Sequence, residues 1–371
     1  MNKIKISHLT SVHPRYDTRI FIKMCSSLAK DTSFSVNLVV ADSKGDEIKH
    51  GVNIIDVGKD IGRVNRILKT TKKVLEKAIE LNSDIYHLHD PELIPIGLKL
   101  KKLGKKVIFD SHEDYPKQIM DRDYLDKRLL SVISFGLTLY EKYACSKFDA
   151  LITATPAIKE KFLKINSLSL DINNYPILGE LSKNIQWDNR KNYIAYVGGI
   201  AKIRGIKEII KSLEYIKQID LILVGQFVEK YIYEEVKNYE GWKNVQEKGF
   251  LNRGDVSTVL SQAKIGMVTF YPLPNHIDAQ PNKMFEYMSA GLPVIASNFP
   301  LWKEIIEGNH CGICVDPMKP QEIANAIKYI IDNPKIAEEM GRNGQQAVKE
   351  KYNWENEEKK LFTLYRTLME E

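Results

Sequence analysis

Cysteine is scarce in this chain of 371 residues, which has only four. So few thiols are typical of proteins from a reducing compartment rather than of disulfide-bonded secreted folds. No secretory signal peptide is apparent, so we expect a cytoplasmic protein. The one C-x-x-C pair, Cys311 and Cys314, lacks the second ligand pair that a zinc site needs, and we assign it to a buried strand.

Long apolar runs and a strong excess of one charge are also lacking. The longest apolar run, Leu129–Tyr140, is interrupted by small and polar residues. It falls short of the roughly 20 residues that span a bilayer. The formal net charge is only +6, and the chain has no platform of aromatic and basic residues. We therefore expect neither a membrane-spanning protein nor a nucleic-acid partner.

Basic residues nevertheless gather in residues 62–81, which are predicted to form one amphipathic helix. At about 100° per residue, five of them fall on one stripe: Arg63, Arg66, Lys69, Lys73 and Lys77. One interpretation is a solvated outer face. The alternative is docking on an anionic membrane surface, where each basic residue contributes about 1 kcal/mol. The second interpretation predicts a peripheral protein on the inner face of the membrane.

The chain is long for one hydrophobic core and suits two domains. Short β-like runs alternate with helical segments, which is typical of parallel α/β domains, and the polar stretch 178–191 is the predicted linker. We predict one domain over 1–180 and another over 192–350. Strands are predicted at Lys3–Ser7, Val36–Ala41, Asp84–Leu88, Lys106–Phe109, Ala150–Thr153, Ile172–Tyr175, Tyr193–Val197, Leu221–Val224, Val245–Gly249, Ile265–Phe270, Pro293–Ala296 and Gly312–Val315.

The stretch Asp278–Ser297 combines a loop, a helix start and a buried strand. Pro281 suits a first helical position, and Gly291 marks the helix end. The start of this helix leaves unpaired backbone N–H groups around Asn282 and Met284, and Lys283 adds a positive charge there. Such a helix start is a phosphate-binding site.

Two acids, Asp278 and Glu286, lie on either side of this helix start, eight positions apart. One interpretation is a loop cap and an acid favoured by the helix dipole. The other is that they bind sugar hydroxyls around a phosphate. The pattern resembles the E-x7-E signature of family 4 glycosyltransferases, with Asp278 in place of the usual Glu. The resemblance implies that Asp278 contacts the donor sugar and Glu286 the nucleotide ribose.

A second stretch, V-G-G-I-A-K-I-R-G at Val197–Gly205, resembles the family loop G-R-L-x-x-x-K-G. In the family, the Arg and Lys of that loop neutralise the donor diphosphate. Arg204 matches the Lys position, but Gly199 replaces the Arg. Fixed cations near a leaving group are usually the largest catalytic contribution. We therefore hypothesise that Lys283 supplies the missing charge.

Two predicted strands before the linker end in histidine and acids, at His89-Asp90 and at Asp110-Ser111-His112-Glu113. Ligands of open α/β sheets lie beyond the carboxyl ends of strands, so these residues indicate one binding site. D-S-H-E-D-Y-P resembles the family segment whose histidine reaches the donor sugar, which implies that role for His112. We place His89, Asp90 and Glu113 on the acceptor side.

The first loop, H-P-R-Y-D-T-R-I, lacks the Gly-Gly pair with which many family members approach the donor phosphates. We place His13 and Asp17 on the acceptor side; the alternative is that Asp17 pairs with Arg19. Asp121-Arg122-Asp123 spells the D-x-D metal motif of a different glycosyltransferase fold. Because it precedes a predicted helix over Tyr124–Lys147, we interpret it as a solvated loop.

The resemblance implies the GT-B fold, in which two doubly wound, Rossmann-like domains face each other across a cleft. It also implies that a helix at 354–371 returns to the first domain. The expected activity is that of a metal-independent, retaining hexosyltransferase without a cofactor. It would move a sugar from a nucleotide-sugar donor to a glycan or lipid-linked saccharide acceptor in cell-surface polysaccharide synthesis. A GT-B nucleotide-sugar epimerase or phosphorylase, or a non-catalytic GT-B partner subunit, is the alternative.

Overall fold

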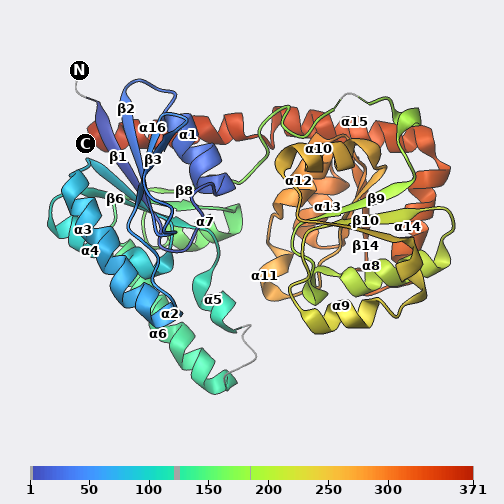
Figure 1. Cartoon of the computed structure of the whole chain (residues 1–371), viewed down its shortest axis with the longest axis horizontal. Helices are drawn as coiled ribbons and strands as arrows, with labels where there is room; N and C mark the ends of the chain where they lie inside the picture. Colours follow the sequence, from blue (N-terminus) through green and yellow to red (C-terminus); the bar gives the residue numbers. More distant parts are fainter. Residues whose placement is uncertain (1–2, 121–125, 184, 371) are drawn as a thin grey trace. The chain divides into compact units, whose positions relative to one another are not determined.

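The computed structural model describes residues 3–120, 126–183 and 185–370. The chain divides into two compact units. Unit 1 comprises Met1–Asn174 together with Glu357–Glu371, and unit 2 comprises Tyr175–Asn356. Figure 1 shows that each unit has a central sheet with helices packed around it. The D-x-D motif at Asp121–Asp123 lies outside the described residues.

Unit 1 has an eight-stranded sheet in the order β3-β4-β2-β1-β5-β6-β7-β8. Its strands are parallel except for the β3–β4 pair. Central strands such as β5 are buried along their whole length, as expected for a parallel sheet covered on both faces. The strands are β1 Ile4–Leu9, β2 Phe34–Val40, β3 Glu47–Lys49, β4 Val52–Asp56, β5 Ile85–Leu88, β6 Lys106–Ser111, β7 Ala150–Thr153 and β8 Ser169–Asp171.

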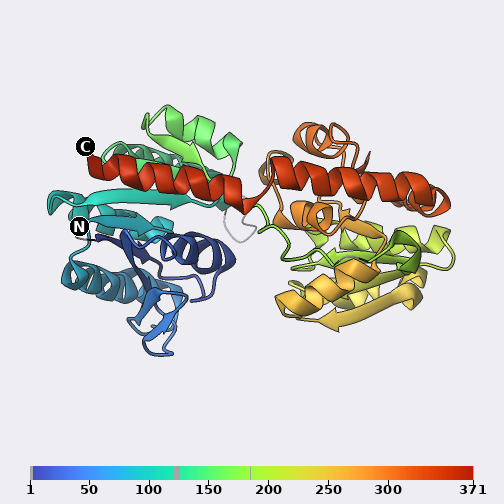
Figure 2. The same cartoon turned by 90° about the horizontal axis from the view of Figure 1, so that it is seen from above.

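The helices α3, α4 and α6 of unit 1 share a hydrophobic core with the central strands. Figure 2 shows α16 running along the unit, where Phe362 stacks on Phe34 of β2 at 6.0 Å between ring centroids. The helices are α1 Ser26–Leu28 after a π-helical segment Thr18–Cys25, α2 Arg63–Asn65, a π-helical turn Arg66–Thr70, α3 Thr71–Leu81, α4 Ile94–Lys102, α5 Tyr115–Met120, α6 Lys127–Cys145, α7 Pro156–Leu163 and, from Glu357 on, α16 Trp354–Glu370.

Unit 2 has a six-stranded, fully parallel sheet in the order β11-β10-β9-β12-β13-β14. Two hydrophobic cores, one on each side, cover it. The strands are β9 Tyr193–Val197, β10 Asp220–Val224, β11 Val245–Gly249, β12 Ile265–Val268, β13 Val294–Ser297 and β14 Gly312–Val315. The helices are α8 Ile206–Ser212, α9 Lys230–Val236, α10 Arg253–Gln262, α11 Pro274–Ile277, α12 Asn282–Ser289, α13 Pro300–Ile306, α14 Pro320–Asp332 and α15 Pro334–Glu350.

The predicted doubly wound α/β class is confirmed in both units. One predicted strand is wrong: residues 172–175 are not extended in the sheet, and the edge strand β8 precedes them at Ser169–Asp171. The hairpin of β3 and β4 was not predicted. Among the described residues, no helix combines the length and the apolar character needed to cross a membrane.

Candidate functional site

The loop after β9 is built so that backbone can approach a ligand. Gly198 has φ 112°, a conformation that side chains rarely adopt. Arg204 follows in a 3-10 turn and folds back, and its Nη1 donates to the carbonyl oxygen of Gly199 at 3.1 Å. A Cβ at Gly199 would meet this Nη1 at 2.9 Å. Gly199 and Arg204 are therefore a matched pair, in which the guanidinium needs the space of the missing side chain.

Lys283, in the first turn of α12, is a buried amine with no acid partner among the described residues. Its Nζ makes no hydrogen bond in the structure, lies 3.7 Å from the ring centroid of Tyr196, and is 3.6 Å from the position that a Cβ on Gly198 would take. Burial, together with the charge of Arg204, lowers the pKa of Lys283 well below its ordinary value, although Glu286 opposes this. An ammonium group is costly to bury without a counter-charge, so an anion bound beside the loop would favour the charged form of Lys283, and its position indicates an anion site.

The start of α12 supplies backbone donors to the same place. No side chain of the described residues caps the helix at Pro281. The N–H of Met284 donates to the carbonyl of Pro281 at 3.0 Å, so the predicted free amide of Met284 is not available. Within the described part of the chain, the N–H groups of Asn282 and Lys283 have no acceptor. These two amides are the ones free to bind an anion.

Glu286 is held by a residue that sequence reasoning missed. Arg253, the first residue of α10, donates to Glu286 Oε1 at 2.6 Å and binds both carboxylate oxygens of Glu180 at 2.8 and 2.7 Å. The salt bridge fixes one oxygen of Glu286 and leaves the other for a ligand. Asp278 is exposed at the end of α11; its predicted contact with the donor sugar stays a prediction.

Replacing Arg253 with methionine should raise the KM for the donor about tenfold and change kcat little. The reason is that Glu286 would lose its orientation while the groups near the leaving diphosphate stay in place. Steady-state kinetics with varied donor concentration measure this. Arg342→Met is the control, because the ion pair that Arg342 forms with Glu338 is exposed. An equal fall of kcat would show that Arg253 acts in the transition state instead.

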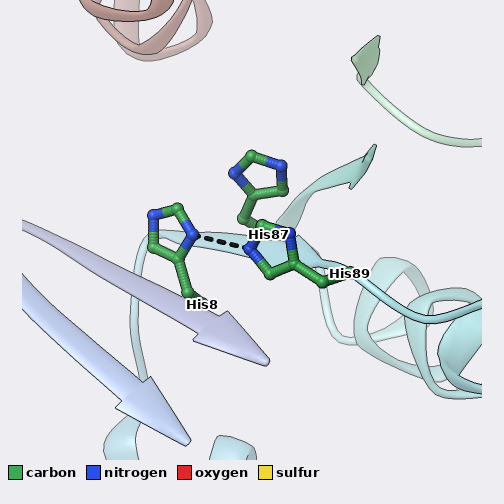
Figure 3. Close-up of side chains that lie close together, drawn as sticks. All are labelled: His8, His87 and His89. Atoms are coloured by element: carbon green, nitrogen blue, oxygen red, sulfur yellow. Dashed lines mark hydrogen bonds between the residues drawn. The ribbon is translucent and has the colours of Figure 1, made fainter. Parts of the chain in front are cut away.

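In unit 1, three buried histidines join strands β1 and β5 (Figure 3). His8 and His89 share a hydrogen bond of 2.8 Å between Nδ1 and Nε2. The hydroxyl of Tyr365, on α16, lies 2.7 Å from His87 Nδ1 and 3.2 Å from His8 Nε2. Neither His8 nor Tyr365 belongs to the predicted site, because only the fold brings them to His87 of β5 and to His89, which follows that strand.

Asp110, at the end of β6, connects this cluster to the predicted His112. Its carboxylate accepts two hydrogen bonds from Arg19, at 2.9 and 2.7 Å, and lies 3.2 Å from His89 Nδ1 and 3.1 Å from His112 Nε2. Burial alone would raise the pKa of Asp110, but Arg19 and His112 hold it well below its usual range. Asp110 therefore fixes the orientation of the His112 ring.

The alternative that Asp17 pairs with Arg19 is wrong. Asp17 caps the helical segment that follows it by accepting from the backbone N–H groups of Arg19 and Ile20, and it lies 3.5 Å from His13 Nδ1. The Arg19 guanidinium is engaged instead with Asp110 and the carbonyl of Ile172. The helix cap satisfies Asp17 locally, which frees Arg19 to neutralise a buried acid.

The predicted acceptor-side residues of unit 1 differ in accessibility. His89 and Asp90 are only 2% and 3% exposed, and Asp90 is held by Thr10 and Ser11. His13 is half-buried, 3.3 Å from Asp90, and Glu113 is exposed. Direct contact of these residues with an acceptor stays a prediction. His13 and Glu113 are more accessible to an acceptor than the buried His89 and Asp90.

The histidine cluster is better suited to hydrogen bonding than to holding a metal ion. His8, His87 and His89 offer nitrogens within 4.8 Å of one another, but His8 and His89 already point at each other and the ring of His87 stacks on His89, with centroids 4.4 Å apart. A tetrahedral ion needs lone pairs that converge on one point. The absence of a metal from the reaction stays a prediction.

Acidification from pH 7 to 5 should lower the free energy of unfolding by a few kcal/mol. Burial lowers the pKa of His89 to about 4, although Asp110 opposes this, and it lowers the pKa of His8 and His87 as well. The unfolded chain takes up these protons near pH 6.5 while the folded chain does not. Stability is therefore lost as pH falls from about 6.5 towards 4.

Urea unfolding at both pH values measures this loss. His8→Asn should reduce it, whereas His310→Asn, at an exposed position with φ 50° that asparagine tolerates, should not. His13 works in the opposite direction: burial lowers its pKa, but Asp17 and Asp90 raise it overall. An unfolding free energy that stays the same at pH 5 would mean that the cluster is not buried as described.

A cavity of about 620 Å³ opens beside the first loop of unit 1. Its charged lining residues are Asp42, Lys44, Lys59, Asp60, Arg63 and Arg66. Both acids are neutralised, Asp42 by Arg15 at 2.6 Å and Asp60 by Lys73 at 3.0 Å, and Arg66 pairs with Glu92 at 2.8 Å. Lys44, Lys59 and Arg63 form no ion pair with any described residue. The cavity therefore carries three uncompensated positive charges.

Each unit is a doubly wound α/β domain, and unit 2 places a cationic Gly-rich loop beside a helix start, an arrangement suited to binding phosphate groups. Residues 179–347, nearly all of unit 2, match the family model described as glycosyl transferases group 1. The chain is 25% identical over 266 residues to the capsular polysaccharide biosynthesis glycosyltransferase CapM of Staphylococcus aureus, covering 64% of this chain and 66% of CapM.

Two solved structures share the fold over almost the whole chain. Sucrose-phosphate synthase from Thermosynechococcus elongatus has a TM-score of 0.78 at 19% identity and covers 99% of both chains. Anabaena HepE in complex with UDP-glucose has a TM-score of 0.75 at 15% identity, covering 98% of this chain and 100% of HepE. The family match of unit 2 and these glycosyltransferase relatives support a glycosyltransferase, and the whole chain has the GT-B fold.

Proposed function

We propose that the protein is a retaining hexosyltransferase that moves a sugar from a nucleoside diphosphate sugar to a saccharide acceptor in cell-surface polysaccharide synthesis. The single observation that carries this proposal is the buried, unpaired Lys283 beside the Arg204 loop. Such a pair of cations is suited to the charge that develops on a departing diphosphate. The UDP-glucose complex of HepE makes a uridine nucleotide the first donor to test, and CapM supports the polysaccharide role.

The proposed mechanism uses only side chains and amides of this chain. Arg204, Lys283 and the amides of Asn282 and Lys283 bind the diphosphate; Glu286, oriented by Arg253, binds the ribose hydroxyls; Asp278 and His112 bind the donor sugar. The bond from the sugar to the diphosphate breaks through an oxocarbenium-like state. The acceptor oxygen attacks the same face, and the leaving phosphate takes its proton. We propose that neither a metal nor a cofactor takes part.

The acceptor is assigned to the cavity of unit 1, and it should carry a phosphoryl group. Three uncompensated cations, Lys44, Lys59 and Arg63, line a space large enough for a sugar. A lysine ammonium binds phosphate as a point charge, and an arginine guanidinium can bind it through two parallel hydrogen bonds. A lipid-linked saccharide phosphate has this chemistry, and so does a soluble sugar phosphate.

The triple variant Lys44→Ser, Lys59→Ser, Arg63→Gln should raise the KM for a phosphorylated acceptor at least tenfold. Donor hydrolysis without an acceptor should stay within twofold, because the changed residues lie outside the donor-binding unit. The exposed residues Lys230, Lys237 and Lys243 of unit 2, changed together to Ser, are the control. An unchanged KM would remove the anionic acceptor from the proposal.

Differential scanning fluorimetry against a panel of nucleotides tests the proposed function. One nucleoside diphosphate should stabilise the protein, by RT ln(1 + [L]/Kd) in free energy. The same nucleotide should stabilise Lys283→Met much less. Stabilisation by none of them would favour the alternative of a non-catalytic partner, and donor turnover to an isomeric nucleotide sugar without acceptor would favour an epimerase.

A further inference from the structure

The helix α6 of unit 1 carries a long apolar face that nothing in the described structure covers. Val132 and Phe135 are 69% and 65% exposed. The other large apolar side chains exposed on this helix include Leu129, Ile133, Leu139 and Tyr143. At about 100° per residue, these residues fall mainly on one stripe, and Figure 1 shows α6 running out beyond its neighbouring helices in the unit. Large apolar patches of this kind mark interaction surfaces.

This stripe is not the side by which the helix packs on its own unit. The buried residues of α6 are Leu130, Glu141, Ala144 and Cys145, which fall on the opposite side of the helix. Glu141 pairs there with Lys161, and Ser134 Oγ donates to the carbonyl of Pro116 in α5 at 2.8 Å. The helix therefore has one apolar side for its own core and a second apolar side that faces solvent.

The charges of α6 determine which partner suits the second apolar side. Its solvent-exposed charged residues are all basic: Lys127, Arg128 and Lys142. Its one acid, Glu141, is buried and paired. A second copy of the chain bound through the same stripe would bring like charges together, which is unfavourable. An anionic lipid surface would instead attract each cation.

A second exposed segment of unit 1 has the same composition. Ile61, Val64 and Leu68 are 87%, 69% and 67% exposed, and Arg63 lies among them. Arg63 Nη2 donates to the hydroxyl of Tyr115 in α5 at 3.3 Å. Because α5 also contacts α6 through Pro116, the two segments are attached to the same short helix.

The basic stripe predicted from the sequence is a weaker candidate. It lies on one continuous helical run from Arg63 to Leu81, but three of its five basic residues are engaged within the unit. Arg66, Lys73 and Lys77 pair with Glu92, Asp60 and Glu80 at 2.8, 3.0 and 2.6 Å. The apolar side chains of α6, rather than this stripe, would carry an attachment to lipid.

We propose that α6, together with the segment Ile61–Leu68, is a membrane-docking surface that lies in the headgroup region of an anionic bilayer. Val132, Phe135 and Ile61 enter the apolar boundary, tyrosines lie at the level of the headgroups, and Arg128 and Lys142 bind lipid phosphates. The helix lies on the membrane and does not span it. This surface is independent of the donor site of unit 2.

Vesicle flotation of the full chain tests this surface. Wild-type protein should float with vesicles that contain about one-third phosphatidylglycerol, and much less with pure phosphatidylcholine. The double variant Val132→Ser, Phe135→Ser should lose at least tenfold in the partition coefficient, and Arg128→Glu, Lys142→Glu should lose a similar factor at low salt. Phe250→Ser is the matched control, because Phe250 is 83% exposed in unit 2 and should change nothing.

Two results would overturn the docking surface. One is equal binding of wild type and the Val132→Ser, Phe135→Ser variant, or no binding of wild type at all. The other is a wild-type dimer that becomes monomeric in the same variant, since this would assign the stripe to a second copy. Donor hydrolysis is measured on each variant in parallel. If hydrolysis is present and vesicle binding absent, the docking surface fails and the proposed function stands.

Discussion

Replacing Lys283 with methionine should lower turnover at least 100-fold without lowering the Tm of the free protein. The Nζ of Lys283 is buried and unpaired, and its pKa is driven down by burial and by Arg204. Removing a buried, uncompensated amine in favour of an apolar side chain of similar shape is neutral or stabilising. A residue that costs stability and is nevertheless present at a ligand site is expected to serve activity.

The size of the effect follows from the charge that the lysine would neutralise. A fixed donor aimed at the developing charge contributes about 10²–10³ in turnover, and Arg204→Ala should fall in the same range. Lys202→Met is the matched control: Lys202 lies in the same loop but is exposed. Single-turnover kinetics and thermal melts on the same preparations measure the turnover and the Tm separately. Near-wild-type turnover of Lys283→Met would refute the hypothesis that this lysine compensates for Gly199.

Replacing Arg19 with methionine should destabilise the protein by about 3–5 kcal/mol, because it leaves the carboxylate of Asp110 buried without its main counter-charge. Arg19 makes two hydrogen bonds to Asp110, and the side chains are 5% and 0% exposed. Loss of this pair should also disorder the ring of His112, which Asp110 holds at 3.1 Å.

The charge explanation is tested by a second substitution. Adding Asp110→Asn to Arg19→Met should restore part of the lost stability, since it removes the uncompensated charge. Arg366→Met is the control, because the Arg366–Asp31 pair is exposed and should contribute less than about 1 kcal/mol. Urea unfolding of the single and double variants gives the coupling free energy between the two substitutions. A double variant less stable than Arg19→Met would contradict this explanation.

The sequence predicts the fold correctly where the local strand or helix pattern matches the burial of the residues in the structure. Strands β9, β11 and β14 begin and end at the predicted residues, since short strand-like runs bounded by turn residues have few other interpretations. The hairpin of β3 and β4 was missed because Glu47–Lys49 is a polar edge segment. The edge strand β8 is short and half-polar, and the sequence favours residues 172–175, which begin with Ile172 and end with Tyr175, as the strand in its place.

In the candidate site, too, the sequence predicts contacts within one element but not contacts between distant elements. Lys283, Asn282 and Glu286 belong to one helix, so their neighbourhood follows from sequence spacing alone. Arg253 lies 33 positions before Glu286, and Tyr365 lies 278 positions after His87. No local pattern indicates such pairs, because the fold brings them together. The sequence predicts a free amide at Met284, but this amide donates to the carbonyl of Pro281 in the first turn of the helix. A sequence motif does not indicate this hydrogen bond.

A structure with a bound nucleoside diphosphate tests the central claim most directly. The account predicts phosphate oxygens at about 2.7–3.0 Å from Lys283 Nζ and from the Arg204 guanidinium, as in charge-assisted hydrogen bonds, with a ribose hydroxyl on Glu286. Phosphates bound elsewhere on unit 2, with Lys283 Nζ still unpaired beneath Tyr196, would contradict it.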